Sequence, residues 1–207
     1  MKSKEVRQDP KLLRNQFKSD NYYGIPTIKK CELKNINLKF IGFDQISYKS
    51  RATEDKAIHF FNDDNKLNSL YNLPERYFKK LAKFEVVLTP DFSLYTDMPL
   101  AIQINSIFKN RWCGAFWQDK GLKAVIPTIT WGAEDSFEFS FLGVEEGSIV
   151  AISTLNVSKE KELFMKGYNK MMEVIKPKLI SCYGVRPFPE MKGNIIWIEY
   201  ISKAGRW

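Results

Sequence analysis

The spacing of apolar positions along the chain predicts buried strands that alternate with amphipathic helices. Two segments repeat their apolar residues every three or four positions, which predicts helices from Pro99 to about Lys120 and from Ser158 to about Ile175. Gly121 and Pro177 suit the ends of these helices. The nearly continuous apolar runs of the second half are typical of strands covered on both faces, and they lie at Phe84–Leu88, Ala124–Trp131, Ser148–Thr154 and Leu179–Tyr183.

The first half of the chain has a less regular pattern. It predicts a helix over Leu73–Leu81, which Pro74 begins, and a polar turn over Asn62–Asn65. A short helix is expected at Lys11–Phe17. The remaining apolar runs predict short strands at Ile25–Ile28, Leu38–Phe43 and Lys56–Phe61, with a last strand at Ile195–Ile201.

Strands that alternate with helices predict an α/β fold with a mainly parallel sheet built from βα repeats, after a short irregular N-terminal region. The pattern leaves open whether the sheet is open or forms a partial or distorted barrel. Pro127 interrupts its apolar run, so we expect it at a sheet edge or a bulge. We expect a flexible basic arm at 1–20, a single domain at 21–202 and a C-terminal tail at 203–207.

Composition narrows the class of protein. A hydrophobic fraction of 44% and an aromatic fraction of 14% exclude disorder for most of the chain. The net charge of +8 is uneven, with +6 over 1–56, −3 over 57–156 and +5 over 157–207. A groove that follows phosphates needs clustered cations, which the two basic ends supply only if they meet in space.

Targeting and metal signals are weak. The charged N-terminus does not resemble a signal peptide, and no apolar run approaches the ~20 residues of a membrane span, so we expect a cytoplasmic protein of a bacterial host cell. The three cysteines are far apart and His59 is the only histidine, which disfavours a zinc site. No cofactor is expected; the alternative is Mg²⁺ held by aspartates such as Asp63, Asp64, Asp91 and Asp97.

Polar side chains follow four of the predicted strands, where a parallel sheet places its binding crevice. We assign the candidate catalytic role to Asp91, Ser93 and Asp97. The candidate ligand-binding residues at the other strand ends are Trp131, Ser136, Ser153, Thr154 and Tyr183. Each also has a structural explanation, since Asp91 suits a turn after Pro90, Asp97 suits a helix cap, and the hydroxyls suit loop backbone groups.

Two further candidates lie seven residues apart on the long predicted helix. Arg111 and Gln118 share one helix face beside Trp112 and Trp117, an arrangement that could hold a phosphate or a nucleobase. The alternative is an arginine that binds nearby carbonyl groups while the tryptophans pack in the core.

Several ordered motifs resemble one family. They cover about residues 20–184 and include HFFNDD (59–64), VLTPDFSLYTDMP (87–99), RWCGAFWQDKG (111–121) and AISTLNV (151–157). Together they are similar to the bacterial and phage family called domain of unknown function 4417. The resemblance implies a setting in phages and mobile elements, and supplies no catalytic residue.

These observations favour a phage or mobile-element protein that binds or acts on nucleic acid or a nucleotide at the strand ends. The alternative is a non-enzymatic binder that inhibits a host or defence protein. A third, weaker hypothesis is a hydrolase of a small sugar or nucleotide that uses Asp91 with a second carboxylate. The pattern does not decide whether the chain is an enzyme, and no membrane partner is expected.

Overall fold

Parallel strands in chain order form the centre of the fold, seen in a computed structural model that describes residues 9–47, 49–50, 55–155 and 157–200. One sheet has the order β1-β2-β3-β4 and the other β5-β6-β7. An isolated parallel bridge between Thr128 and Ala151 joins the two. The strands are β1 (Lys39–Gly42), β2 (Lys56–His59), β3 (Val86–Leu88), β4 (Ala124–Ile126), β5 (Ile149–Ser153), β6 (Leu179–Gly184) and β7 (Ile195–Glu199).

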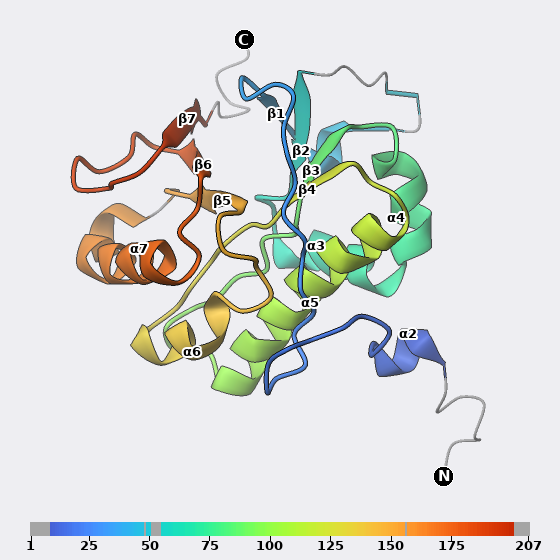
Figure 1. Ribbon diagram of the computed structural model, residues 1–207, viewed down its shortest axis with the longest axis horizontal. Coiled ribbons are helices and arrows are strands. Elements are labelled where there is room, and N and C mark those ends of the chain that lie inside the picture. The colour runs from blue at the N-terminus through green and yellow to red at the C-terminus, as the bar shows by residue number, and fades with distance from the viewer. Residues whose placement is uncertain (1–8, 48, 51–54, 156, 201–207) are drawn as a thin grey trace.

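Helices connect most of these strands and lie around them (Figure 1). This arrangement confirms the predicted α/β fold with parallel sheets. No helix in the described residues is both long and apolar enough to cross a membrane. The elements are α2 (Pro10–Leu13), η1 (Phe43–Gln45), α3 (Asp64–Asn72), α4 (Pro74–Leu81), α5 (Leu100–Asp119), η2 (Glu134–Ser136), α6 (Phe137–Ser140), η3 (Val157–Glu160) and α7 (Lys161–Val174).

The strands curl, so that side chains of β6 meet those of the first two strands. The ring of Tyr183 in β6 lies 5.9 Å from Phe40 of β1 and 4.7 Å from His59 of β2, measured between ring centroids. It also stacks on Phe61 at 4.9 Å with an angle of 8° between the ring planes. An open, flat sheet would hold β1 and β6 far apart. The described strands therefore form a partial barrel, which decides between the two predicted arrangements.

The strand and helix predictions of the second half are close to the observed bounds, except that the strand predicted at Ala124–Trp131 ends at Ile126. Pro127 directly follows β4, the edge strand of the four-stranded sheet, in agreement with the expected edge or bulge. Its carbonyl accepts a hydrogen bond from the Ala151 N–H at 2.9 Å. Pro127 therefore marks the point where the chain changes its partner from β3 to β5, and its missing N–H costs no ladder bond there.

Two predictions of the first half are wrong. Ile25–Ile28 is not a strand, since only Ile28 pairs, in a single bridge with Val144. The polar stretch at 62–65 was expected to be a turn, but α3 begins within it at Asp64. This helix buries only Leu67 and Leu70, so its apolar stripe is too short to stand out from the polar residues around it.

The described part of the N-terminal arm packs against the domain. The Arg14 guanidinium lies between two rings, 4.3 Å from the centroid of Tyr71 and 4.2 Å from that of Trp112. It also donates a hydrogen bond to the Tyr71 carbonyl at 2.9 Å. Phe17 packs on the same Trp112. The expected C-terminal tail, 203–207, lies outside the described residues.

Candidate functional site

A pocket of about 710 Å³ lies where β2, β3, β4 and β5 end. Parallel strands bring their carboxyl ends to one side, so the loops that follow them meet there. The volume is in the range of ordinary small-molecule sites. The lining residues are Phe61, Asn62, Asp63, Asp91, Ser93, Leu94, Tyr95, Thr96, Asp97, Ile129, Thr130, Trp131, Gly132, Ser153, Leu155, Val157, Glu160, Leu163 and Phe164.

Asp91 lies in the loop after β3. Among the titratable residues that line this pocket, it has the most strongly shifted pKa. Burial and, to a smaller extent, the negative charge of the neighbouring Asp64 together raise its pKa to about 7. A carboxyl group with a pKa near 7 can both donate and accept a proton at neutral pH. Asp91 thus has the protonation behaviour expected of an acid–base group.

The carboxylate of Asp64 holds the loop that carries Asp91. It accepts hydrogen bonds from the Ser93 backbone N–H at 3.1 Å and from the Ser93 hydroxyl at 3.2 Å. These bonds tie the Asp64 carboxylate to the loop that carries Asp91. Two carboxyl groups with different environments lie together, one tied by donors and one partly buried.

A buried polar network fixes the start of the same loop. The Thr128 N–H donates to the Thr89 hydroxyl at 2.7 Å, and the Thr128 hydroxyl donates to the Thr89 carbonyl at 2.8 Å. Asn110 of α5 accepts from the Thr89 hydroxyl and donates to the Pro90 carbonyl at 2.7 Å. The ends of β3 and β4 are thereby tied to the long helix, directly before Asp91.

Trp131 forms an aromatic wall of the pocket together with Phe164 of α7, with ring centroids 5.2 Å apart. The indole ring lies so close to Gly167 that a Cβ atom there would be 2.2 Å from the indole nitrogen. The neighbouring loop is fixed by the Gly132 N–H, which donates to the Ser136 hydroxyl at 2.9 Å. Glycine at 167 therefore permits the position of this wall.

The remaining charges of the lining are negative. Asp63, Asp97 and Glu160 are exposed at the rim. None of the described lining residues is a lysine or an arginine. A phosphate group in this pocket would therefore meet carboxylates without a compensating cation.

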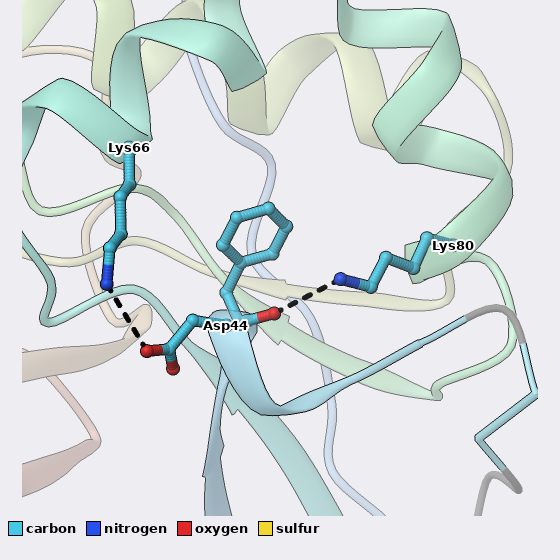
Figure 2. Close-up of polar contacts among 4 residues, drawn as sticks. Asp44, Lys66 and Lys80 are labelled. Carbon is cyan, nitrogen blue, oxygen red and sulfur yellow. Dashed lines mark hydrogen bonds and ion pairs between the residues drawn. The ribbon is translucent and has the colours of Figure 1, made fainter.

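Two lysines bind the turn that follows β1 (Figure 2). Lys66 of α3 pairs with Asp44 at 3.5 Å, and Lys80 of α4 donates to the Phe43 carbonyl at 3.3 Å. Both ammonium groups are directed to η1. They stabilise the turn after β1, and neither lines the pocket.

Five of the ten predicted site residues line this pocket. Ser93 is bound to Asp64 as described, and the Ser153 hydroxyl accepts a hydrogen bond from the Leu155 N–H at 3.2 Å. The structure therefore brings together the polar ends of β3, β4 and β5. The five residues are Asp91, Ser93, Asp97, Trp131 and Ser153.

Arg111 and Gln118 lie elsewhere. Arg111 is fully buried, and its guanidinium donates to the carbonyl groups of Leu142, Thr128 and Ser140 at 2.9–3.0 Å. Burial lowers its pKa to about 9. The amide of Gln118 pairs with the backbone of Lys29 through two hydrogen bonds, at 2.9 and 2.7 Å. Both side chains hold segments of the chain together, and the carbonyl partners of Arg111 agree with the structural alternative given for it.

Three further candidates lie behind the pocket wall. Ser136 positions Gly132, and the Thr154 hydroxyl donates to the Val185 carbonyl at 2.6 Å. Tyr183 supports the lining residue Phe61 by stacking on it. These side chains position the strand-end loops, and none of them is among the residues that line the pocket.

Of the wall formed after β2, only Asp63 and the neighbouring Asp64 had been considered, as ligands in the magnesium alternative. Phe61, Asn62 and Asp63 line the pocket, and Asp64 lies behind it. The signal was available, because these residues directly follow an apolar run, as Asp91 does. The polar composition of 62–65 instead suggested a turn. Glu160, on the opposite wall, has no comparable signal, since α7 begins three residues after the expected cap at Ser158.

His59 and the metal alternative can also be placed. His59 lies buried in the aromatic stack at the end of β2, where burial lowers its pKa to about 4. Its Nδ1 accepts a hydrogen bond from the Phe61 N–H at 3.3 Å. Among the described residues, no three His, Cys, Asp or Glu side chains are grouped in a way that could hold a metal ion.

Comparisons with known proteins place the chain in a family. It is 35% identical over 176 residues to "Gene 1 protein" of Mycobacterium phage L5, which covers 83% of this chain and 76% of that protein. It is also 35% identical to "Gene 1 protein" of Mycobacterium phage D29, over 83% of this chain and 64% of that protein. No solved structure matches. The family model described as "Domain of unknown function (DUF4417)" matches residues 17–201, and the chain belongs to this family.

Proposed function

We propose that this phage-related protein binds a small organic molecule in the strand-end pocket and exchanges a proton with it through Asp91. The observation that carries the proposal is the position of Asp91 in the strand-end pocket, on a loop that the Asp64 carboxylate binds through Ser93. A partly buried carboxyl beside a second, hydrogen-bonded carboxylate is a recurrent arrangement for general acid–base catalysis. Asp91 lines the pocket, and burial, with a smaller contribution from the negative charge of Asp64, raises its pKa.

The pocket supports a small ligand better than a nucleic-acid strand. Strand binding depends mainly on lysine and arginine contacts to phosphates, and the described lining has carboxylates instead. Arg111, the predicted phosphate ligand on α5, is buried and occupied by carbonyl groups. Nucleic-acid binding would therefore need another surface. Labelled DNA and RNA at two salt concentrations test this, and we expect no binding that depends on Asp91 or Asp97.

A proton titration combined with a ligand screen tests the proposal. The ¹³C signal of the Asp91 side chain is followed from pH 4 to pH 9, and we expect its midpoint near 7. A small-molecule library is then screened by thermal shift with wild type, Asp91→Asn and the distant control Glu173→Gln. Ligands that stabilise the wild type and the control, but not Asp91→Asn, support the proposal. An Asp91 midpoint near 4, together with hits that ignore the substitution, would overturn it.

A further inference from the structure

The charge of the pocket restricts what it can bind. Asp63, Asp97 and Glu160 are spread around the rim, on the loops after β2 and β3 and at the start of α7. Asp91 adds a fourth carboxyl group deeper in the pocket. A concave site lined by charges of one sign concentrates ligands of the opposite sign. The geometry therefore favours a cationic ligand over a neutral or anionic one.

The described protein does not neutralise this charge itself. In the residues that the structure describes, neither Asp63, Asp97 nor Glu160 forms an ion pair with a lysine or arginine. Lys161, next to Glu160 in the chain, pairs with Glu190 instead. The rim carboxylates are thus left for a ligand.

A metal ion is a poor match for the site, because its acidic groups are too dispersed to form a coordination set. The walls are suited to an organic cation instead. Four lining residues have aromatic rings, and tryptophan is the strongest of the three aromatic types in attracting a cation to its face. These four are Phe61, Tyr95, Trp131 and Phe164.

A further group in the lining points to a ligand in the same place. The Asn62 side-chain nitrogen is buried, and no described residue accepts a hydrogen bond from it. A buried donor without a partner is destabilising, so a ligand oxygen in reach of this amide would stabilise the site.

We propose that the natural ligand of this pocket is a small organic cation, bound by the rim carboxylates and the aromatic wall around Trp131. This inference rests on the proposed function, because it names the ligand class of the same site. When such a cation binds, the protonated fraction of Asp91 releases its proton to the solvent, since a positive charge beside a carboxyl favours its ionised form.

Choline and its neutral isostere 3,3-dimethylbutan-1-ol are suitable probes, because both carry one hydroxyl and nearly the same shape. Binding to the full chain is followed by ¹⁵N NMR of the tryptophan indole signals, with Trp131→Phe used to assign Trp131. We expect choline to move the Trp131 signal with a dissociation constant at least about tenfold lower than that of the alcohol. Added NaCl should weaken the binding of choline and leave the binding of the neutral alcohol unchanged.

Substitutions of the rim carboxylates test whether these groups bind choline. Neutralising the rim with Asp63→Asn, Asp97→Asn and Glu160→Gln together should weaken choline binding about tenfold, at roughly two- to threefold for each exposed carboxylate. These side chains are exposed, so the triple variant is expected to fold. Glu173→Gln, on the exposed surface of α7, is the matched control and should bind choline as the wild type does. Calorimetry at pH 7 in two buffers should detect proton release with choline and none with the alcohol.

The outcomes separate this inference from the proposed function. Equal binding of both probes at Trp131 would overturn the cationic ligand and leave a small-molecule site intact. No response to choline up to about 50 mM would also overturn it, while the Asp91 titration and library screen would still decide the proposed function. Choline binding that survives the triple variant would show that the rim carboxylates do not recognise the cation.

Discussion

The indole ring of Trp131 and the backbone of Gly167 lie in direct contact, because residue 167 has no Cβ atom. Trp131 lies in the loop after β4, and Gly167 lies in α7. Their contact sets the position of the aromatic wall of the pocket. Glycine is an unfavourable residue inside a helix, so its presence at this position is explained by the space that the indole requires.

Gly167→Ala should destabilise the protein by about 1–3 kcal/mol, because the new methyl group overlaps the indole of Trp131. In a Trp131→Ala background the same substitution should stabilise by up to about 1 kcal/mol, since alanine is the better helix former. Urea unfolding of the four proteins gives the coupling free energy. A substitution at Gly167 with the same effect in both backgrounds would refute the contact.

Asp91 should make the protein less stable as the pH rises. Its folded-state pKa of about 7 lies above the unfolded value near 3.8, so its stabilising contribution is complete below pH 4 and is lost as the pH rises through 7. The loss should be on the order of 2 kcal/mol. Asp91→Asn should remove this part of the pH dependence, measured by urea unfolding at pH 4.5, 6 and 8.

His59 should act in the opposite direction. Its folded-state pKa of about 4 lies below the unfolded value of 6.5, so its contribution is present above pH 6.5 and is lost as the pH falls through 4. The contribution should be on the order of 2 kcal/mol and should disappear in His59→Phe, which retains an aromatic ring. The two groups partly cancel in the wild type, so each single variant should show a steeper pH profile than the parent. Parallel profiles would contradict both assignments.

Arg14→Ala should destabilise the protein by about 1–2 kcal/mol, because the guanidinium lies between the rings of Tyr71 and Trp112 and binds the Tyr71 carbonyl. Lys18→Ala, at an exposed position of the same arm, is the control and should change the stability by less than about 0.5 kcal/mol. Thermal unfolding measures both. An effect of Arg14→Ala as small as that of Lys18→Ala would mean that the guanidinium contacts contribute little to the folded state.

Arg111→Lys should be destabilising by about 2–4 kcal/mol even though it keeps the charge. An ammonium group cannot reproduce the fork that reaches the carbonyl groups of Leu142, Thr128 and Ser140, and those groups would lose buried hydrogen bonds. Arg186→Lys, at an exposed position, should be nearly neutral. An Arg111→Lys protein with wild-type stability would show that the guanidinium geometry is not required.

The sequence predicted the features that depend on local composition. The apolar run at Leu179–Tyr183 corresponds to β6, and Pro99 and Gly121 flank α5 closely. The position of Asp91 at the pocket followed from the same reasoning, because parallel strands place their carboxyl ends together.

The features that depend on distant contacts could not be predicted. Asp64 binds Ser93, which lies 29 residues away, and no spacing rule connects a helix start to a separate strand-end loop. Arg111 was ambiguous because its partners are backbone carbonyl groups, which have no signature in side-chain sequence. The curl of the sheet could not be predicted for the same reason. It depends on contacts between rings of β1, β2 and β6, which meet only in the folded chain.

The stack of Tyr183 on His59 and Phe61 has a consequence for synthesis of the protein on the ribosome. The first two strands emerge long before Tyr183, so their aromatic side chains have no β6 partner during most of translation. Contacts between residues so far apart in the chain are formed slowly, because a long loop must close before they can stabilise anything. The barrel can therefore complete its curvature only once β6 has left the exit tunnel, and until then the early strands present an uncovered aromatic face to the cell.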